Sequence, residues 1–274
     1  MKKVAIVGLG WLGMPLAMAL TARGWQVTGS KTTPDGVEAA RMCGISAYQL
    51  QLTPELECDA DELEALLSVD ALVVTLPASR TAEGGENYLR AVQNLVDSAL
   101  VFNVPRLIFT SSTSVYGNDA GVMKENSPLR PMTVAGQTLV ALENWLHDLP
   151  GTSVDILRLS GLVGPKRHPG RFLAGKTDVP NGEHGVNLVH LDDVVAAIML
   201  LLQTPKGGHI YNLSAPAHPA RQQFYLAVAQ QLGVTPPTFA AATNKKGKII
   251  DGNKICDELG FEYRYPDPMV MPLG

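Results

Sequence analysis

The sequence predicts an α/β fold built on a doubly wound parallel sheet. Short apolar runs alternate along the chain with segments of helical periodicity, which indicates βαβ units with parallel strands. A glycine-rich turn joins the first apolar run to the first helical segment. The 26 glycines and 19 prolines among 274 residues also supply the tight turns that short connections need.

Composition excludes several classes of protein. A hydrophobic fraction of 46% rules out intrinsic disorder, and no apolar run approaches the ~20 residues of a membrane-spanning helix. A net charge of −4 without a basic stripe argues against nucleic-acid binding. The three cysteines lack metal-ligand spacing. We therefore expect a cytoplasmic protein with no metal, nucleic-acid or membrane partner.

The N-terminal region predicts a nucleotide site. Residues 4–7 form a short apolar strand, and residues 12–22 a helix. Between them stands G-x-G-x-x-G, whose Gly8 permits the tight turn, Gly10 lets a pyrophosphate approach the backbone, and Gly13 lets helix and strand pack closely. The helix N-terminus favours the phosphates. A secretory signal peptide needs no such glycines; a glycine-rich turn without a ligand is the remaining alternative.

The end of the second strand bears on which dinucleotide binds. NAD-binding proteins usually carry an acidic residue there, whereas this chain has Ser30, Lys31 and Thr32. These donors suit a 2′-phosphate, so we expect NADP rather than NAD. Residues 33–35, Thr-Pro-Asp, also read as the cap of the next helix. The predicted cofactor-binding residues are Gly8, Gly10, Trp11, Leu12, Gly13, Ser30, Lys31, Thr32, Leu76 and Pro77.

The alternation continues toward the C-terminus. The predicted strands are residues 4–7, 25–28, 45–50, 70–76, 106–110, 154–159 and 209–213, and the predicted helices are residues 12–22, 59–67, 86–102, 134–147, 192–202, 221–232 and 255–259. After about residue 164 the pattern loosens. We expect a Rossmann-type domain over residues 1–163 and a small C-terminal appendage on the substrate side, residues 164–274, interleaved with the end of the sheet.

Several segments resemble the extended short-chain dehydrogenase/reductases, which include the NAD-dependent epimerase/dehydratase group. They are S-S-T-S-V-Y-G at 111–117, R-L-S-G-L-V-G-P at 158–165, N-L-V-H-L-D-D-V at 187–194, G-G-H-I-Y-N-L at 207–213 and N-K-I-C-D-E-L-G at 253–260. The resemblance covers nearly the whole chain. It implies a nicotinamide cofactor and a small-molecule substrate such as an anionic compound or a nucleotide sugar. It also implies one way to form a homodimer, through helices 86–102 and 134–147.

The chain departs from this family at its catalytic helix. Family chemistry uses a Ser or Thr after the fifth strand and a Tyr-x-x-x-Lys pair in the following helix. Ser112 matches the first position, but Ala135 and Leu139 stand at the tyrosine and lysine positions when counted back from Glu143. The glycine signature also differs from the G-x-x-G-x-x-G usual in the extended family. Tyr116 is a candidate substitute proton donor, although the family uses this tyrosine mainly for packing.

For several other polar residues, both a structural and a functional role are considered. His190 fits a structural histidine better than a catalytic one. The loop around His168 holds Lys166, Arg167 and Arg171, which suit either an anionic substrate or a solvated surface. Residues 170–177 match the Walker A string, but the surrounding prolines allow neither the strand nor the helix of a phosphate loop.

Two functions therefore follow from the sequence. The first is an NADP-dependent oxidoreductase or epimerase whose acid/base groups differ from those of the family, with Ser112 and Tyr116 as the candidate catalytic residues. The second is a dinucleotide-binding protein without turnover, such as a redox sensor that acts through a partner.

Overall fold

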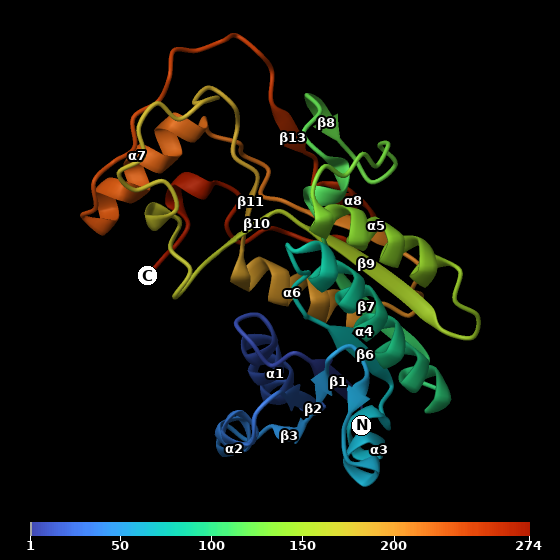
Figure 1. The fold of residues 1–274 in the computed structure, drawn as a ribbon. Coiled ribbons are helices and arrows are strands. Elements are labelled where there is room, and N and C mark those ends of the chain that lie inside the picture. The colour runs from blue at the N-terminus through green and yellow to red at the C-terminus, as the bar shows by residue number, and fades with distance from the viewer. Residues whose placement is uncertain (1) are drawn as a thin grey trace. The chain divides into compact units, whose positions relative to one another are not determined.

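The computed structural model describes residues 2–274, and its centre is a seven-stranded sheet in the order β12-β9-β7-β6-β1-β2-β3 (Figure 1). The registers of β1, β2, β3, β6 and β7 are parallel. The strands are β1 (Lys3–Val7), β2 (Gln26–Lys31), β3 (Ser46–Gln49), β6 (Ala71–Val74), β7 (Arg106–Ser112), β9 (Ser153–Leu159) and β12 (Ile210–Leu213). The order steps outward in both directions from β1, which confirms the predicted doubly wound α/β fold.

Helices cover both faces of this sheet. The helices of the described chain are α1 (Gly13–Ala22), α2 (Pro34–Met42), α3 (Ala60–Leu67), α4 (Ala82–Val101), α5 (Val134–His147), α6 (Leu191–Gln203), α7 (Arg221–Leu232) and α8 (Lys254–Leu259). The chain steps from β1 to β3 in one direction and from β6 to β9 in the other. Right-handed crossovers therefore place α1 and α2 on one face and α4 and α5 on the opposite face. Figure 1 shows α4 and α5 side by side, and they pack against each other.

Local sequence explains the elements near the glycine turn. Strands β1 and β6 are apolar and buried nearly throughout, as expected for parallel strands covered on both faces. Three helices begin with a threonine whose hydroxyl accepts the backbone N–H of a glycine three positions later, which is standard N-capping. These pairs are Thr33 with Gly36 in α2, Thr81 with Gly84 in α4, and Thr133 with Gly136 in α5.

The chain divides into two compact units whose segments alternate along the sequence. Unit 1 comprises residues 1–115, 131–157 and 197–210, and unit 2 comprises residues 116–130, 158–196 and 211–274. Unit 1 also holds the short antiparallel pair β4 (Gln51–Leu52) and β5 (Leu56–Glu57).

Unit 2 holds two small parallel pairs, β8 (Gly121–Met123) with β13 (Lys248–Ile250) and β10 (Gly161–Val163) with β11 (Leu188–His190). One of its cores gathers buried apolar side chains from distant segments: Val163, Val186, Leu188, Ala215, Phe224, Val228, Met271 and Leu273. Single-turn 3-10 helices occur at Thr113–Tyr116, Pro169–Arg171 and Pro268–Val270.

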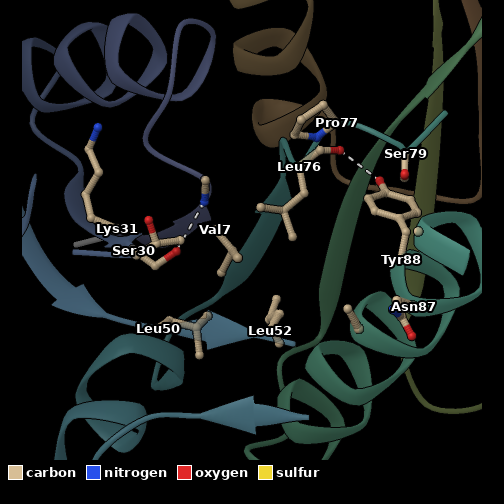
Figure 2. Close-up of a pocket in the computed structure, with 14 residues that line it drawn as sticks. Val7, Ser30, Lys31, Leu50, Leu52, Leu76, Pro77, Ser79, Asn87 and Tyr88 are labelled. Carbon is tan, nitrogen blue, oxygen red and sulfur yellow. Dashed lines mark hydrogen bonds between the residues drawn. The ribbon is translucent and has the colours of Figure 1, made fainter. Parts of the chain in front are cut away.

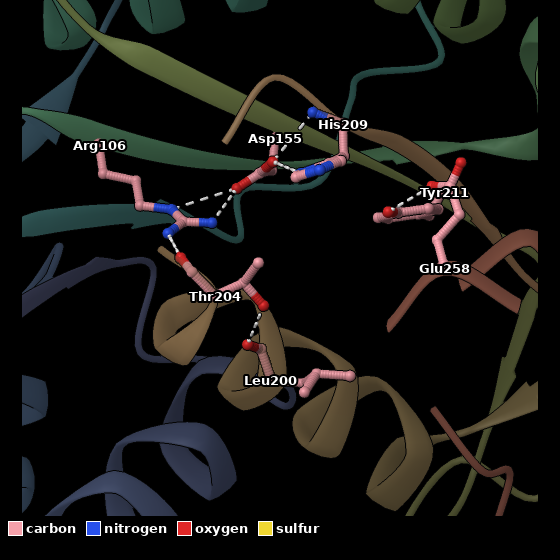
Figure 3. Close-up of polar contacts among 7 residues, drawn as sticks. All are labelled: Arg106, Asp155, Leu200, Thr204, His209, Tyr211 and Glu258. Atoms are coloured by element: carbon pink, nitrogen blue, oxygen red, sulfur yellow. Dashed lines mark hydrogen bonds and ion pairs between the residues drawn. The ribbon is translucent and has the colours of Figure 1, made fainter. Parts of the chain in front are cut away.

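A buried carboxylate ties together several elements of unit 1 (Figure 3). Asp155 of β9 is fully buried, and the Arg106 Nη2 atom lies 2.7 Å from its Oδ2. On the other side, the backbone nitrogen and the ring Nδ1 of His209 each lie 3.0 Å from Oδ1. Arg106 also donates to the carbonyl of Thr204, which follows α6. The network therefore fastens β7, β9 and the residue before β12 to one charged group.

Most predicted element bounds agree with the structure within a few residues, and α5 and α7 match fully. Two differences bear on the site: β2 continues to Lys31 rather than ending at residue 28, and β7 continues to Ser112 rather than ending at residue 110. Helix α4 begins at Ala82 because Thr81 caps it. Nothing in the sequence analysis anticipated the short strands β4, β5, β8, β10, β11 and β13. Within residues 2–274, no helix is both long and apolar enough to cross a membrane.

Candidate functional site

The predicted glycine turn connects β1 to α1 in the conformation that its glycines require. Gly8 has a φ of +104°, which side-chain-bearing residues rarely adopt. A Cβ atom on Gly13 would lie 2.0 Å from the carbonyl oxygen of Gly8, so only glycine allows α1 to begin this close to the turn. A Cβ on Gly10 would meet nothing within 4 Å. The space over Gly10 is therefore open to a ligand.

Two hydroxyl groups hold this turn. The Ser30 hydroxyl, at the end of β2, accepts a hydrogen bond of 3.2 Å from the backbone N–H of Gly8. The Thr75 hydroxyl, just after β6, donates to the Gly8 carbonyl over 2.5 Å. Thr75 is not among the residues predicted for the site, although its place at the carboxyl end of a buried strand is a signal for ligand contact.

A cavity of about 310 Å³ opens beside the turn (Figure 2). It is bounded by the ends of β1 and β2, the segment around β4, the residues after β6, and the first turns of α4. Its lining residues are Val7, Gly8, Ser30, Lys31, Thr32, Leu50, Leu52, Leu76, Pro77, Ser79, Gly84, Asn87, Tyr88 and Ala91. The carboxyl ends of parallel strands thus form one wall, which is where open α/β sheets bind ligands.

One wall of the cavity is fixed by Tyr88. Its hydroxyl donates to the carbonyl of Leu76 over 2.8 Å (Figure 2). Burial raises the pKa of Tyr88, so the phenol stays protonated and keeps this donor role. The bond links α4 to the residues after β6 and leaves the aromatic ring at the cavity wall.

The charge on the cavity lining is of one sign, positive. Among the described lining residues none is acidic, and Lys31 is the cation. In Figure 2 the Lys31 side chain extends away from Leu50 and Leu52. Its aliphatic part passes close to Gly36 near the start of α2, since a Cβ there would lie 3.3 Å from Lys31 Cδ. A ligand anion at the end of β2 would therefore meet no opposing carboxylate from this lining.

The structure brings together six of the predicted cofactor residues as lining: Gly8, Ser30, Lys31, Thr32, Leu76 and Pro77. Gly10, Trp11, Leu12 and Gly13 lie in the adjoining turn and at the start of α1. Five further lining residues are not among those predicted from the sequence: Leu50, Leu52, Ser79, Asn87 and Tyr88. The two leucines follow β3 and could have been inferred from strand order, whereas the α4 residues depend on how that helix packs.

The candidate catalytic serine ends β7. Ser112 is half-buried, and its hydroxyl accepts a 3.1 Å hydrogen bond from the backbone N–H of Ser114. The preceding Ser111 is buried and donates to Oε2 of Glu143 in α5 over 3.0 Å. That bond joins α5 to β7. Because the Ser112 hydroxyl accepts in its bond with Ser114, its own hydrogen remains available for donation.

Helix α5 carries apolar groups where the catalytic pair would stand. Leu139 is 3% exposed and belongs to the core. Ala135 lies beside Gly136, whose missing side chain allows the Ser114 carbonyl within 2.8 Å of the Cβ position. The helix therefore packs closely against the residues after β7 while presenting no titratable group at either position.

Tyr116 belongs to unit 2, and its hydroxyl is engaged there. The side chain is 1% exposed; the hydroxyl donates to Oδ1 of Asn212 over 2.6 Å and accepts from Nη1 of Arg158 over 2.9 Å. Burial raises the pKa of Tyr116, although the charge of Arg158 opposes the shift. These contacts favour packing, the role in which the family mainly uses this tyrosine.

The two histidines considered from the sequence make local contacts in unit 2. His190 is 1% exposed; Nδ1 accepts from the backbone N–H of Asp192 at 3.0 Å, and Nε2 lies 2.8 Å from the Pro272 carbonyl. Both ring nitrogens are thus used within the fold. The Nδ1 atom of His168 accepts from the Gly170 N–H over 3.0 Å. Burial, assisted by the charge of Arg171, lowers the pKa of His168.

The Walker-like string at residues 170–177 lacks the surroundings of a phosphate loop. No β-strand directly precedes it, and no helix directly follows it.

Known proteins are similar to this chain in sequence and in fold. Residues 4–214 match the model of the NAD-dependent epimerase/dehydratase family. Protein YeeZ of Escherichia coli K12 is 69% identical over the full length of both chains. A conserved protein of unknown function from Silicibacter pomeroyi has a TM-score of 0.78 at 24% identity, covering 98% of this chain and 96% of its own. The Bordetella bronchiseptica enzyme WbmG, solved with NAD and UDP, has a TM-score of 0.77 at 21% identity, covering 97% and 92%.

These matches agree with the geometry. The family model begins within β1, runs through the glycine turn, the cavity-lining segments and the catalytic-helix region, and ends just after β12. The full-length identity to YeeZ extends the relationship through the C-terminal segments. Family, fold and glycine turn therefore lead to one assignment: the chain belongs to the NAD-dependent epimerase/dehydratase family.

Proposed function

We propose that the protein binds a nicotinamide dinucleotide with its adenosine end in the cavity of unit 1 and its pyrophosphate over the glycine turn. The observation that carries this proposal is the open space above Gly10 next to a closely packed Gly13, at the N-terminus of α1. The apolar wall formed by Leu50, Leu52 and Leu76 suits the face of an adenine ring.

We further propose NADP rather than NAD. Lys31 and Thr32 line the cavity at the end of β2, where NAD-binding proteins usually place a carboxylate. A lysine ammonium there attracts a 2′-phosphate, and an acidic residue would repel it. Ser30 can still donate its own hydroxyl hydrogen while it accepts the Gly8 N–H.

Separate titrations with NADPH and NADH test the preference. The parent protein should bind NADPH more tightly, and Lys31→Glu should reverse the order by weakening NADPH. Lys124→Glu, at an exposed position of unit 2, is the matched charge control and should leave both affinities unchanged. Tighter binding of NADH by the parent protein would overturn the NADP assignment.

The proposed reaction is hydride transfer on a small substrate, either an anionic compound or a nucleotide sugar. When bound, the nicotinamide ring supplies the hydride donor or acceptor. Ser112 donates its hydroxyl hydrogen to a substrate oxygen while the Ser114 N–H holds the serine oxygen in place. General acid/base catalysis contributes about 10² to 10⁴ in rate. Positioning alone therefore permits slow turnover without the tyrosine and lysine of the family.

A second candidate function is dinucleotide sensing without turnover. The apolar Ala135 and the buried Leu139 favour it, since they leave the two catalytic positions of α5 without a proton donor. In this case the protein would bind the cofactor as tightly as an enzyme does and transmit its redox state to a partner.

Oxidation of NADPH in the presence of carbonyl compounds and nucleotide sugars separates the two functions. Turnover that Ser112→Ala abolishes or lowers by at least about tenfold supports the enzyme. Ser68→Ala, at an exposed position after α3, is the matched control and should keep full activity. Tight NADPH binding without turnover on any compound supports the sensor.

A further inference from the structure

Two glutamine side chains hold the short connection between β2 and α2 in unit 1. The ladder between β2 and β3 ends where the Leu50 N–H donates to the Lys31 carbonyl over 2.9 Å. The next carbonyl along the chain belongs to Thr32, and the Nε2 atoms of Gln49 and Gln51 each donate to it over 3.2 Å. A carbonyl oxygen only accepts hydrogen bonds, so both amides turn their NH₂ groups toward it.

These glutamines alternate along the chain with leucines that line the cavity. Side chains point alternately to opposite sides of an extended segment. Leu50 and Leu52 lie at the cavity wall (Figure 2). Gln49 and Gln51 therefore project from the other side of the segment, and their amides meet at the Thr32 carbonyl. One short segment thus lines the cavity and also holds the chain that follows β2.

The hairpin that carries Gln51 is itself attached to α4. Gln51 belongs to β4, which pairs antiparallel with β5. The Asn94 side chain of α4 donates to the Pro54 carbonyl in the turn of this hairpin over 3.1 Å. Nearby, the Arg90 Nη2 atom lies 2.8 Å from the Glu55 carboxylate. The hairpin therefore connects two walls of the cavity, the end of β2 and helix α4.

The position of the Lys31 side chain depends on this connection. Thr33 caps α2 by accepting the Gly36 N–H over 3.1 Å. The aliphatic stem of Lys31 lies against the same glycine, with Cδ 3.3 Å from its Cβ position. The stem thus rests on the first turn of α2, and that turn follows directly from the chain that Gln49 and Gln51 hold. A segment that is ordered before binding loses less conformational entropy when a ligand binds.

We propose that Gln49 and Gln51 are positioning residues for the choice of cofactor, because they hold Lys31 and Thr32 in place for a 2′-phosphate. The inference rests on the proposed function, since it concerns the residues that the 2′-phosphate of NADP would meet. NADH carries a neutral hydroxyl instead of this phosphate, so its affinity depends much less on where the lysine charge lies. Loss of the two amides should therefore weaken NADPH binding and leave NADH binding nearly unchanged.

Calorimetric titrations with NADPH and with NADH test this role in Gln49→Met, Gln51→Met and the double variant. Methionine keeps the length of the side chain but has no N–H donor. In the double variant the ratio of the NADH Kd to the NADPH Kd should fall about tenfold, through weaker NADPH binding. Each single variant should lose part of this ratio. An unchanged ratio, or an equal loss of both affinities, would overturn the proposal.

Gln26→Met is the matched control for these variants. Gln26 is exposed at the opposite end of β2, so its replacement should keep the parental ratio. Gln49 and Gln51 are only partly buried, and circular dichroism checks that their variants fold as the parent does.

Hydrogen exchange in the ligand-free protein measures the positioning directly. The Gly36 N–H bonds to the Thr33 hydroxyl and the Val37 N–H bonds to the Thr33 carbonyl. Both should exchange at least about threefold faster in the double variant, and unchanged rates would show that the glutamines do not position this turn. A parent that prefers NADPH, with the same ratio in the double variant, contradicts the role of the glutamines alone. A parent that binds NADH more tightly contradicts the NADP assignment of the proposed function, on which the exchange rates do not depend.

Discussion

The Ser30 hydroxyl oxygen lies 3.2 Å from the Gly8 backbone nitrogen and accepts its hydrogen, which joins the end of β2 to the turn after β1. Ser30 is 5% exposed, so water replaces this acceptor poorly. We expect Ser30→Ala to lower the free energy of unfolding by about 1–3 kcal/mol, because the Gly8 N–H loses its partner. Dinucleotide affinity should fall as well. Urea denaturation and NADPH titration measure the two effects. Unchanged values for both would contradict the role assigned to this bond.

The two glycines of the turn should respond differently to alanine. Gly13→Ala places a Cβ atom 2.0 Å from the Gly8 carbonyl oxygen, so it should destabilise the fold and abolish dinucleotide binding. Gly10→Ala meets nothing within 4 Å and should fold with nearly parental stability. Its new methyl group, however, occupies the space proposed for the pyrophosphate and should weaken NADPH binding at least about tenfold. Full binding by Gly10→Ala would place the pyrophosphate elsewhere.

Tyr116→Phe separates packing from proton donation. The change removes a hydroxyl that bonds Asn212 and Arg158 in the interior of unit 2. We expect a loss of about 1–3 kcal/mol in the free energy of unfolding because buried polar groups lose a partner. The Kd for NADPH should not change. A stable variant that loses turnover would show that the hydroxyl acts as a proton donor.

Asp155→Asn should be one of the more destabilising single changes in unit 1. The carboxylate is fully buried and is contacted by the Arg106 guanidinium and by the backbone nitrogen and ring Nδ1 of His209. Breaking a buried charge pair costs about 3–5 kcal/mol, which chemical denaturation can measure. Asp119→Asn is the matched control in an exposed pair with Arg130, and it should cost less than about 1 kcal/mol. Equal effects would mean that the buried network contributes little.

Features of the fold that depend on residues close together in the chain can be predicted from the sequence. Features that depend on tertiary packing cannot. The apolar strands, the glycine turn and the Thr33 cap of α2 follow from neighbouring residues and are predicted from the sequence, whereas the Thr81 cap that begins α4 is not. The cavity walls depend on tertiary packing: Tyr88 reaches the Leu76 carbonyl only once α4 lies beside β6. Strand β13 likewise depends on its pairing with β8, a segment more than 100 residues away in the chain, so it could not be recognised before the structure.

Glu125 in unit 2 should make stability depend on pH. Burial raises the pKa of this carboxyl, opposed by the Asn212 backbone N–H and by the charge of Lys254. The folded state therefore holds the proton more tightly than the unfolded state. Its contribution to stability is full below the unfolded pKa and is lost as the pH rises through the folded pKa.

Glu125→Gln removes this ionisation but retains an oxygen that can accept the Asn212 N–H. The free energy of unfolding of the variant, relative to the parent, should rise with pH above the ordinary glutamate pKa of about 4.3 and level off once the folded carboxyl is ionised. Urea titrations at intervals between about pH 4 and about pH 8 give this difference directly. Glu64→Gln, at an exposed position of α3, is the control for changing a glutamate as such. A difference that falls with pH, or that Glu64→Gln reproduces, would show that ionisation of Glu125 does not oppose folding.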